Sequence, residues 1–274
     1  MDINTVTDVQ RPRRRGEIGQ PRAGDAFLGG GTFLFSEPQP GLTRLIDLPG
    51  LDWTPLVAGP GGLDIAATCT IAELYAFEAP AGWTAAPLIG ECCRAFLASF
   101  KVWNMATVGG NICLGLPAGP MISLATALDA RCLVWTAGGG ERLLSVPELV
   151  RGPRDTALAP GECLRGLEVP AAALARRVAF RRASLTPLGR SGVLLIGTLG
   201  RDGSFQLTVT AATRRPLRLD FPTPPDRVAL DARLADAIPQ ALYYDDVHGR
   251  PDWRRHMTRL FAGEIHAELL EAAP

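Results

Sequence analysis

The amino-acid sequence predicts an α+β protein, in which a two-part nucleotide-binding region precedes a smaller C-terminal domain of antiparallel sheet and helices. Two glycine-rich loops, at 28–32 and 107–111, lie far apart in the chain. The segment 201–204 places Asp-Gly between two apolar runs, which is a strong signal for a β-hairpin. Two segments with helical character, 226–238 and 251–271, follow that hairpin. We therefore expect strands and helices to be mixed in the N-terminal part of the chain, and an antiparallel sheet with helices to form the C-terminal part.

The first sub-domain is expected over residues 1–58. Residues 26–28 predict a short buried strand that runs into the first glycine loop. Residues 32–36 are expected to open a helix, and 44–48 to form the next strand. A Pro/Gly cluster at 58–62 marks the boundary to the second sub-domain.

The second sub-domain is expected over residues 59–172. It begins with a strand at 63–67, and Thr70 to Glu73 form a capping box that opens a helix through Phe77. A helix over 85–100 would carry Leu88, Cys92, Phe96 and Phe100 on one face. The remaining expected elements are a helix at 121–130 and strands at 131–136, 141–146 and 162–169.

The C-terminal domain is expected over residues 173–274. Strands at 192–199 and 205–211 flank the hairpin turn. In the second strand, apolar residues alternate with Gln206, Thr208 and Thr210. Such alternation indicates a half-buried antiparallel sheet with a polar outer face. Helices follow at 226–238 and 251–271, and one face of the second helix carries Trp253, Met257, Leu260 and Phe261.

The composition restricts the class of protein. The 274 residues carry 28 basic and 28 acidic side chains, so nothing suggests general attraction to nucleic acid or to a membrane surface. No apolar run reaches the roughly 20 residues that span a bilayer. The basic stretch at 11–15 is not followed by an apolar segment, which argues against export and favours the cytoplasm. The six cysteines show no cluster or zinc-ribbon spacing, and no metal site is expected in this chain.

The glycine loops indicate a diphosphate ligand. Consecutive amide groups beside glycine form a concave donor site that suits phosphate, and two such loops could hold one dinucleotide from both sides. The Rossmann pattern G-x-G-x-x-G and the P-loop pattern are both missing. No acid–base or nucleophile set is evident, so no catalytic residue is assigned and a cofactor is expected to carry the chemistry.

Five ordered segments resemble one family. Residues 27–34 with 45–48 resemble "LAGGTDLL…LVDL", 65–74 resemble "IGAxTTHAEL", and 104–111 resemble "RNxATIGGN"; 158–162 and 215–218 resemble "LxPGELI" and "RPxR". These motifs are similar to those of the FAD-binding medium subunits of molybdenum hydroxylases, which include the xanthine and carbon monoxide dehydrogenases.

The resemblance implies a fold and a set of cofactor contacts. The fold would be the two-part FAD-binding domain of the vanillyl-alcohol-oxidase-like (PCMH) type, followed by the C-terminal domain. Thr70 would lie beside the flavin, and Pro120 stands where the family has a cofactor-contacting Asp. The residues expected to bind FAD are Leu28, Gly29, Gly30, Gly31, Thr32, Phe33, Leu34, Thr70, Asn104, Thr107, Val108, Gly109, Gly110, Asn111 and Pro120.

Three positions depart from the family pattern. Phe33 and Pro120 each replace an Asp, and near the start of the C-terminal domain Gly189 replaces another, with Arg190 adding a charge. These departures mark a divergent branch and bear on the contacts to the flavin. Arg190 could face the flavin or an acceptor, or lie on a surface or at an interface.

The resemblance also implies partners. Substrate would be oxidised on a large molybdopterin subunit, and electrons would pass through 2Fe–2S clusters of a small subunit to FAD in this chain and then to an external acceptor. The complex would be a heterotrimer or a dimer of heterotrimers. Two alternatives stay open. One is a free-standing flavin oxidase of the vanillyl-alcohol-oxidase class, for which Cys113 is the thiol near the loops. The other is a scaffold that has lost its flavin, which Pro120 and Gly189 favour.

Overall fold

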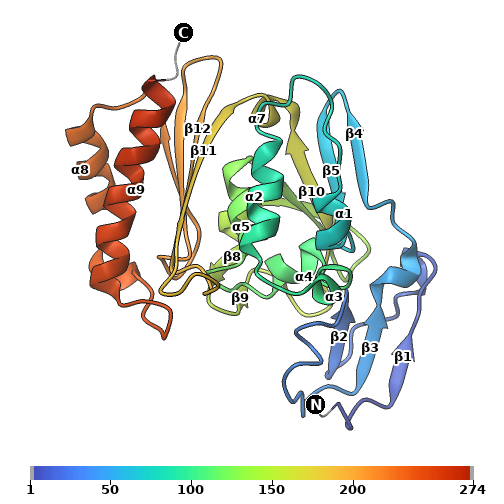
Figure 1. Cartoon of the computed structure of the whole chain (residues 1–274). Coiled ribbons are helices and arrows are strands. Elements are labelled where there is room, and N and C mark those ends of the chain that lie inside the picture. The colour runs from blue at the N-terminus through green and yellow to red at the C-terminus, as the bar shows by residue number, and fades with distance from the viewer. Residues whose placement is uncertain (1–2, 272–274) are drawn as a thin grey trace.

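The computed structural model describes residues 3–271 and contains three consecutive units of structure (Figure 1). The N-terminal strands lie at one end of the molecule, a mixed sheet-and-helix unit lies in the middle, and the C-terminal sheet with its two helices lies at the other end. Helices and antiparallel strands are both prominent, so the predicted α+β class is confirmed.

A three-stranded parallel sheet opens the chain. Its order is β1-β3-β2, with bounds of Asp8–Gln10 for β1, Asp25–Leu28 for β2 and Arg44–Asp47 for β3. Short 3-10 turns lie at Arg15–Glu17 and Leu48–Leu51. The two predicted strands of this segment are confirmed.

The helix predicted to open at 32–36 is wrong. These residues form a turn, in which the Phe35 amide donates to the Gly31 carbonyl at 2.9 Å. The Ser36 hydroxyl donates to the Phe33 carbonyl at 2.7 Å. Pro38 lies two residues after Ser36 and disfavours helical backbone at Glu37, so the turn does not extend into a helix.

The middle unit is built on a five-stranded antiparallel sheet. Its order is β4-β5-β10-β6-β7, with β4 at Leu56–Gly59, β5 at Gly62–Ala66, β10 at Cys163–Pro170, β6 at Arg131–Trp135 and β7 at Glu141–Ser145. The Pro/Gly cluster forms the tight turn between β4 and β5. The unit boundaries at 58/59 and 172/173 stay predictions.

Short helices cover this sheet. They are α1 (Ile71–Tyr75), α2 (Pro87–Ala95), α3 (Phe100–Trp103), α4 (Val108–Cys113), α5 (Pro120–Ala127), α6 (Val146–Leu149) and α7 (Ala171–Leu174). A small hairpin joins β8 (Val150–Gly152) to β9 (Asp155–Thr156). The predicted capping box at Thr70 is confirmed, because its hydroxyl accepts from the Glu73 amide and the Glu73 carboxylate accepts from the Thr70 amide.

The single helix predicted over 85–100 is wrong, because the chain breaks it into α2 and α3. Leu97 adopts a left-handed backbone conformation with φ of 48°, which ends the helical path. Phe100 is consequently 73% exposed instead of lying on the buried face with Leu88 and Cys92. The break turns Phe96 and Leu97 toward the pocket described below.

The C-terminal unit is a four-stranded antiparallel sheet covered by helices. The order is β11-β12-β13-β14, with bounds of Arg177–Ala183, Val193–Leu199, Phe205–Thr210 and Leu217–Phe221. Helix α9 (Pro251–Glu271) packs on β11 and β12, and α8 (Arg227–Ala237) packs on α9. A 3-10 turn at Gln240–Leu242 joins these helices. The predicted hairpin and both helices are confirmed.

The alternation of residue types in β13 had suggested that the polar face of this sheet faces solvent. The structure shows that it does not. All six residues of β13 are buried, because helix α5 of the middle unit packs on this face. The hydroxyls of Ser123 and Thr210 lie 2.6 Å apart, and the Gln206 amide donates to Asp129 at 3.0 Å. The alternation of residue types shows which face is polar, but not whether solvent or another unit covers it. Here Gln206 and Thr210 have partners across the boundary between two units, whereas the buried hydroxyl of Thr208 has no hydrogen-bond partner among the described residues.

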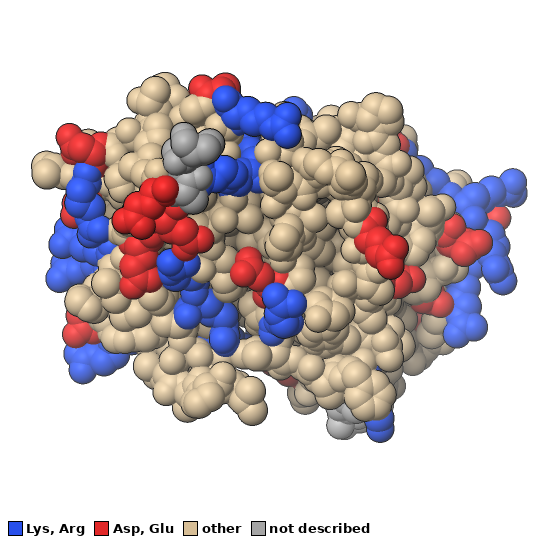
Figure 2. All heavy atoms as spheres, turned by 45° about the horizontal axis from the view of Figure 1, so that its top comes forward, with Lys and Arg blue, Asp and Glu red and all other residues tan. Residues whose placement is uncertain are grey.

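Acidic and basic groups are interspersed over the surface in the view of Figure 2, and this face is neither wholly positive nor wholly negative. Several of these groups pair, as Arg181 does with Glu264 and Glu268, each at 2.7 Å. Within residues 3–271, no helix combines the length and apolar character needed to cross a membrane.

Candidate cofactor-binding site

The two glycine loops meet directly. A Cβ atom on Gly30 would lie 1.4 Å from the Met105 carbonyl oxygen, so only glycine lets the first loop pass this close to the second. A Cβ on Gly29 would lie 2.8 Å from the Thr107 hydroxyl. Two loops that are remote in sequence therefore form one continuous surface, and part of the glycine requirement comes from loop-to-loop contact.

The second loop is held from behind by the segment before α1. The Val108 amide donates to the Cys69 carbonyl at 2.8 Å, and the Gly109 amide donates to the Ala67 carbonyl at 2.9 Å. A Cβ on Gly109 would lie 2.5 Å from the Cβ of Ala67, which requires glycine for this packing. Thr107 caps α4 by accepting from the Gly110 amide at 3.0 Å.

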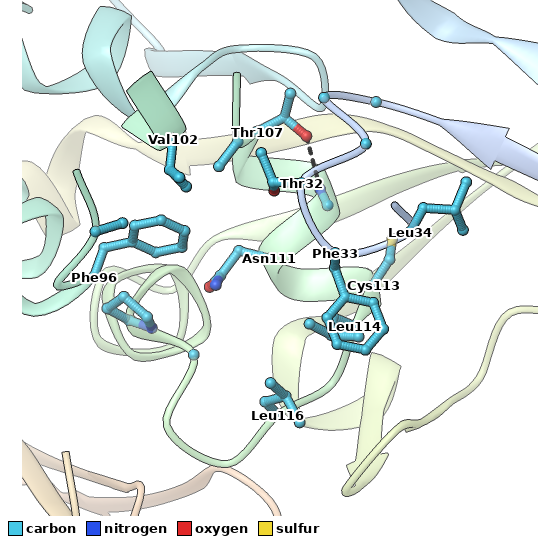
Figure 3. Close-up of a pocket in the computed structure, with 18 of the residues that line it drawn as sticks. Thr32, Phe33, Leu34, Phe96, Val102, Thr107, Asn111, Cys113, Leu114 and Leu116 are labelled. Carbon is cyan, nitrogen blue, oxygen red and sulfur yellow. Dashed lines mark hydrogen bonds between the residues drawn. The ribbon is translucent and has the colours of Figure 1, made fainter. Parts of the chain in front are cut away.

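A pocket of about 510 Å³ opens beside these loops (Figure 3). Its walls come from all three units of the chain: the first glycine loop, the α2–α5 region and the loop between β11 and β12. The lining residues are Phe27, Leu28, Gly29, Gly30, Gly31, Thr32, Phe33, Leu34, Ala95, Phe96, Leu97, Ala98, Val102, Ala106, Thr107, Gly110, Asn111, Cys113, Leu114, Leu116, Ala118, Gly119, Pro120, Leu188 and Arg190.

The first glycine loop offers main-chain donors to this pocket. Within the described chain, the amides of residues 29–34 donate no hydrogen bond to another residue, while every one of these residues lines the pocket. Gly31 has φ of +70°, a conformation that favours glycine and bends the loop. Successive free amides in a bent loop form a concave site that binds anionic oxygen atoms.

Asn111 connects the second loop to α5. Its side-chain oxygen accepts from the Met121 amide at 3.1 Å, which fixes the side chain at the start of that helix. In Figure 3 the amide group of Asn111 points into the pocket. Pro120 is the first residue of α5, is buried, and lines the pocket without a main-chain donor of its own.

The remaining walls are mostly apolar. The Phe33 ring lies under the guanidinium of Arg154, whose central carbon is 4.8 Å from the ring centroid, and Arg154 also pairs with Glu37 at 2.7 Å. These contacts tie the first loop to the β8–β9 hairpin. Burial raises the pKa of the Cys113 thiol to about 12, so that it stays protonated at neutral pH.

Eleven of the residues predicted to bind the cofactor line this pocket, and four do not. Those that line it are Leu28, Gly29, Gly30, Gly31, Thr32, Phe33, Leu34, Thr107, Gly110, Asn111 and Pro120. Thr70 caps α1, Asn104 ends α3, and Val108 and Gly109 face the supporting segment. The contacts of all fifteen with a cofactor stay predictions.

Sequence reasoning missed the apolar wall. Phe96, Leu97, Val102, Leu114 and Leu116 all line the pocket. Their apolar character alone does not distinguish a pocket wall from a core, so no local signal identified them. Arg190 had a signal, because a charged residue there departs from the family pattern.

The fold and the pocket together define an α+β protein with a candidate cofactor site, in which main-chain amides are the free hydrogen-bond donors along one wall. The family profile described as "FAD binding domain in molybdopterin dehydrogenase" matches residues 20–172, which is more than half of the chain. The chain belongs to this family. No curated protein sequence gives a significant match.

Solved structures share the fold over the whole chain. Quinoline 2-oxidoreductase from Pseudomonas putida 86 is 19% identical with a TM-score of 0.79, covering 100% of this chain and 99% of that one. Reconstituted CO dehydrogenase from Oligotropha carboxidovorans is 22% identical with a TM-score of 0.80, covering 97% and 98%. Carbon monoxide dehydrogenase from Hydrogenophaga pseudoflava, lacking the Mo-pyranopterin moiety, is 22% identical with a TM-score of 0.76, covering 98% and 97%.

The pocket fits FAD, the cofactor of this family. Free amides of residues 29–34 match the needs of a diphosphate, and the long apolar wall from Phe96 to Leu116 matches those of aromatic ring systems. The glycines at 29 and 30 let this loop pass close to the second loop, and Gly31 lets it pass close to the Phe35 ring.

Proposed function

We propose that this chain is the FAD-carrying electron-transfer subunit of a molybdenum hydroxylase. In this proposal the pocket between the glycine loops and the C-terminal unit would hold FAD, which would supply the means to pass electrons on to an external acceptor. The observation that carries the proposal is the joined pair of glycine loops with free amides along one wall. The fold is assigned to the PCMH type of FAD-binding domain.

The chain's own residues have three tasks in this proposal. Residues 29–34 bind the diphosphate through their amides, and Asn111 fixes the second loop against α5. The apolar wall shields the ring systems from water, which strengthens electrostatic interactions inside the pocket. FAD supplies the electron-accepting chemistry when bound, and the protein supplies binding, orientation and electrostatics.

The composition of the walls supports an electron carrier over a free-standing oxidase. An oxidase would have a proton-transferring group within hydrogen-bond reach of its substrate. The lining residues include no Asp, Glu, His, Lys or Tyr, and the high pKa of Cys113 makes that thiol a poor nucleophile.

The partners in this proposal are a small subunit with 2Fe–2S clusters and a large subunit with molybdopterin. Substrate is oxidised on the large subunit, and electrons reach this chain through the clusters. The three-subunit assembly works in the cytoplasm. All six cysteines are free, as is usual in a reducing compartment.

Reduction kinetics test the proposal. The FAD-loaded chain is mixed anaerobically with small organic substrates, and separately with its iron–sulfur and molybdenum partners and their substrate. Fast bleaching of the flavin only with the partners is expected. Fast bleaching by a small substrate without partners would indicate an oxidase instead, and a chain that never retains FAD would indicate a scaffold.

A further inference from the structure

Arg190 is the one charged residue among those that line the pocket. Its side chain is exposed, and it forms no ion pair with any carboxylate in residues 3–271. The other lining residues are apolar, glycine, hydroxyl or amide residues. Arg190 therefore brings a single unpaired positive charge to the wall of an otherwise uncharged pocket, although water on its exposed side screens part of its field.

The backbone around Arg190 is held firmly. The Arg182 guanidinium donates from Nε to the Ser191 hydroxyl at 2.7 Å and from Nη2 to the Gly189 carbonyl. These two residues flank Arg190 directly. The Gly189 amide also donates to the Thr186 carbonyl at 2.9 Å. The base of the Arg190 side chain is therefore anchored to strand β11.

Arg190 and the free amides lie on different walls. The loop from β11 to β12 comes from the C-terminal unit, whereas residues 29–34 come from the N-terminal unit. In Figure 3 the ribbon of the C-terminal unit enters at the lower left, away from the first glycine loop at the upper right. FAD carries a ring system on each side of its diphosphate, the adenine and the flavin. With the diphosphate held at the amide wall, Arg190 on the other wall would face one of these two ring systems, and only the flavin changes its charge on reduction.

We propose that Arg190 faces the flavin ring and stabilises the negative charge that the ring gains on reduction. This inference rests on the proposed function. Two electrons from the iron–sulfur partner and one proton from water convert the uncharged ring into a reduced ring with one negative charge. The guanidinium offsets that charge, so it favours the reduced state and raises the midpoint potential, since charge near the ring nitrogens tunes flavin electronics.

Three variants of the FAD-loaded full chain test this assignment, with the protein studied alone and in the complex with which it co-purifies. Arg190→Gln removes the charge, and Arg190→Lys keeps it. Arg201→Gln is the matched control, because Arg201 is exposed in the β12–β13 turn and outside the pocket. The midpoint potential is measured by dye-equilibrated reduction, and the Kd of oxidised FAD and of ADP by titration.

We expect Arg190→Gln to raise the ratio of the Kd for reduced FAD to the Kd for oxidised FAD about tenfold, which lowers the two-electron potential by about 30 mV. Arg190→Lys should retain most of the wild-type potential, and Arg201→Gln all of it. The Kd of oxidised FAD and of ADP should change less than threefold in every variant.

Two results would overturn the inference while leaving the proposed function intact. One is an unchanged potential in Arg190→Gln. The other is a large loss of affinity for both ADP and oxidised FAD, which would place Arg190 at the diphosphate. Failure of the wild-type chain to hold FAD, alone and in complex, would instead overturn the proposed function and this inference with it.

Discussion

The Cα of Gly30 lies so close to the Met105 carbonyl that a Cβ atom built on Gly30 would stand 1.4 Å from the oxygen. Gly30 belongs to the N-terminal unit, and Met105 precedes the second glycine loop of the middle unit. The contact fixes the separation of the two loops, and that separation sets the width of the wall at which a diphosphate would bind. Loop spacing is therefore the property on which the cofactor site depends.

Replacing Gly30 with Ala should separate the loops. The added methyl group meets main-chain atoms that cannot rotate away, and such overpacking costs about 1–3 kcal/mol. We expect a lower free energy of unfolding and weaker FAD binding, measured by denaturant titration and flavin fluorescence. Gly41→Ala is the control, because a Cβ at Gly41 meets nothing within 4 Å. Equal behaviour of the two variants would contradict the role of the contact.

Variants of Asn111 should separate its structural role from its role in binding. Asn111→Ala removes the acceptor of the Met121 amide and should cost about 1–2 kcal/mol in the free energy of unfolding. Asn111→Asp keeps an acceptor there and should be nearly as stable as wild type. Its added negative charge should still weaken FAD binding by roughly tenfold or more, through repulsion of the diphosphate. Wild-type FAD affinity in Asn111→Asp would place the diphosphate elsewhere.

The buried hydroxyl pair between the middle and C-terminal units should show energetic coupling. The Thr210 hydroxyl also donates to the Leu194 carbonyl at 3.2 Å, and the hydroxyls of Ser123 and Thr210 share a hydrogen bond at 2.6 Å. Ser123→Ala and Thr210→Val should each lower the free energy of unfolding by about 1 kcal/mol. The loss of unfolding free energy in the double variant should be smaller than the sum of the two single losses. Once one hydroxyl is removed, the second substitution no longer breaks the hydrogen bond between the two residues. Strict additivity in a double-mutant cycle would show that the pair does not interact.

Part of the loss of stability in acid should come from the loss of the ion pair between Asp25 and Arg44. The guanidinium of Arg44 donates two hydrogen bonds to this carboxylate and holds its pKa below the ordinary value of 3.8. A lowered folded-state pKa means that this stabilisation is present above about pH 4 and is lost as the pH falls through the folded value. Wild type should therefore destabilise more steeply below pH 4 than Asp25→Asn, as measured by urea unfolding across pH.

Asp236→Asn is the control for that experiment, because the Asp236 side chain is 79% exposed and its pair with Arg233 lies on the surface. Its pH profile should follow wild type. If Asp25→Asn also follows wild type through the acid range, the Asp25–Arg44 pair does not contribute to acid sensitivity.

Local signals predicted much of the fold. The Asp-Gly turn, the Thr70 capping box and the helix that begins at Pro251 are set by residues adjacent in sequence, and all three are confirmed. The split between α2 and α3 depends on the left-handed conformation of Leu97, which no local pattern signals in a leucine. Strand β11 was missed, because arginines interrupt its apolar pattern and its partner β12 lies beyond a loop.

The burial pattern of helix α9 also differs from the one that the sequence predicted. The apolar residues Trp253, Met257, Leu260 and Phe261 were expected on one face, yet Leu260 is 43% exposed while Arg254 is 1% exposed. Arg254 is buried because it donates to the carbonyls of Gly192 and Gly249 and pairs with Asp246. Asp246 and Gly249 lie in the loop just before α9, and Gly192 lies in a loop far away in the sequence, so hydrophobic periodicity alone could not predict a buried arginine here.

The candidate site was likewise predicted from the sequence only in part. Its loops were predicted from glycine content, and the structure shows that part of this content serves contact between loops, as at Gly30 and Gly109. The apolar wall, and the position of Leu188 and Arg190 beside the pocket, depend on how the three units of the chain pack together. Sequence motifs therefore predicted the two loops that line the pocket, and the apolar walls around them depend on the tertiary structure.

The cofactor content of the purified chain decides whether the pocket between the glycine loops holds FAD. The chain is purified alone and with the proteins that co-purify with it, and the yellow chromophore released by denaturation is identified by chromatography and mass. We expect FAD, released without covalent attachment and close to one per chain in the complex. A folded chain that contains no flavin in either form, and that binds none when FAD is added, would contradict it.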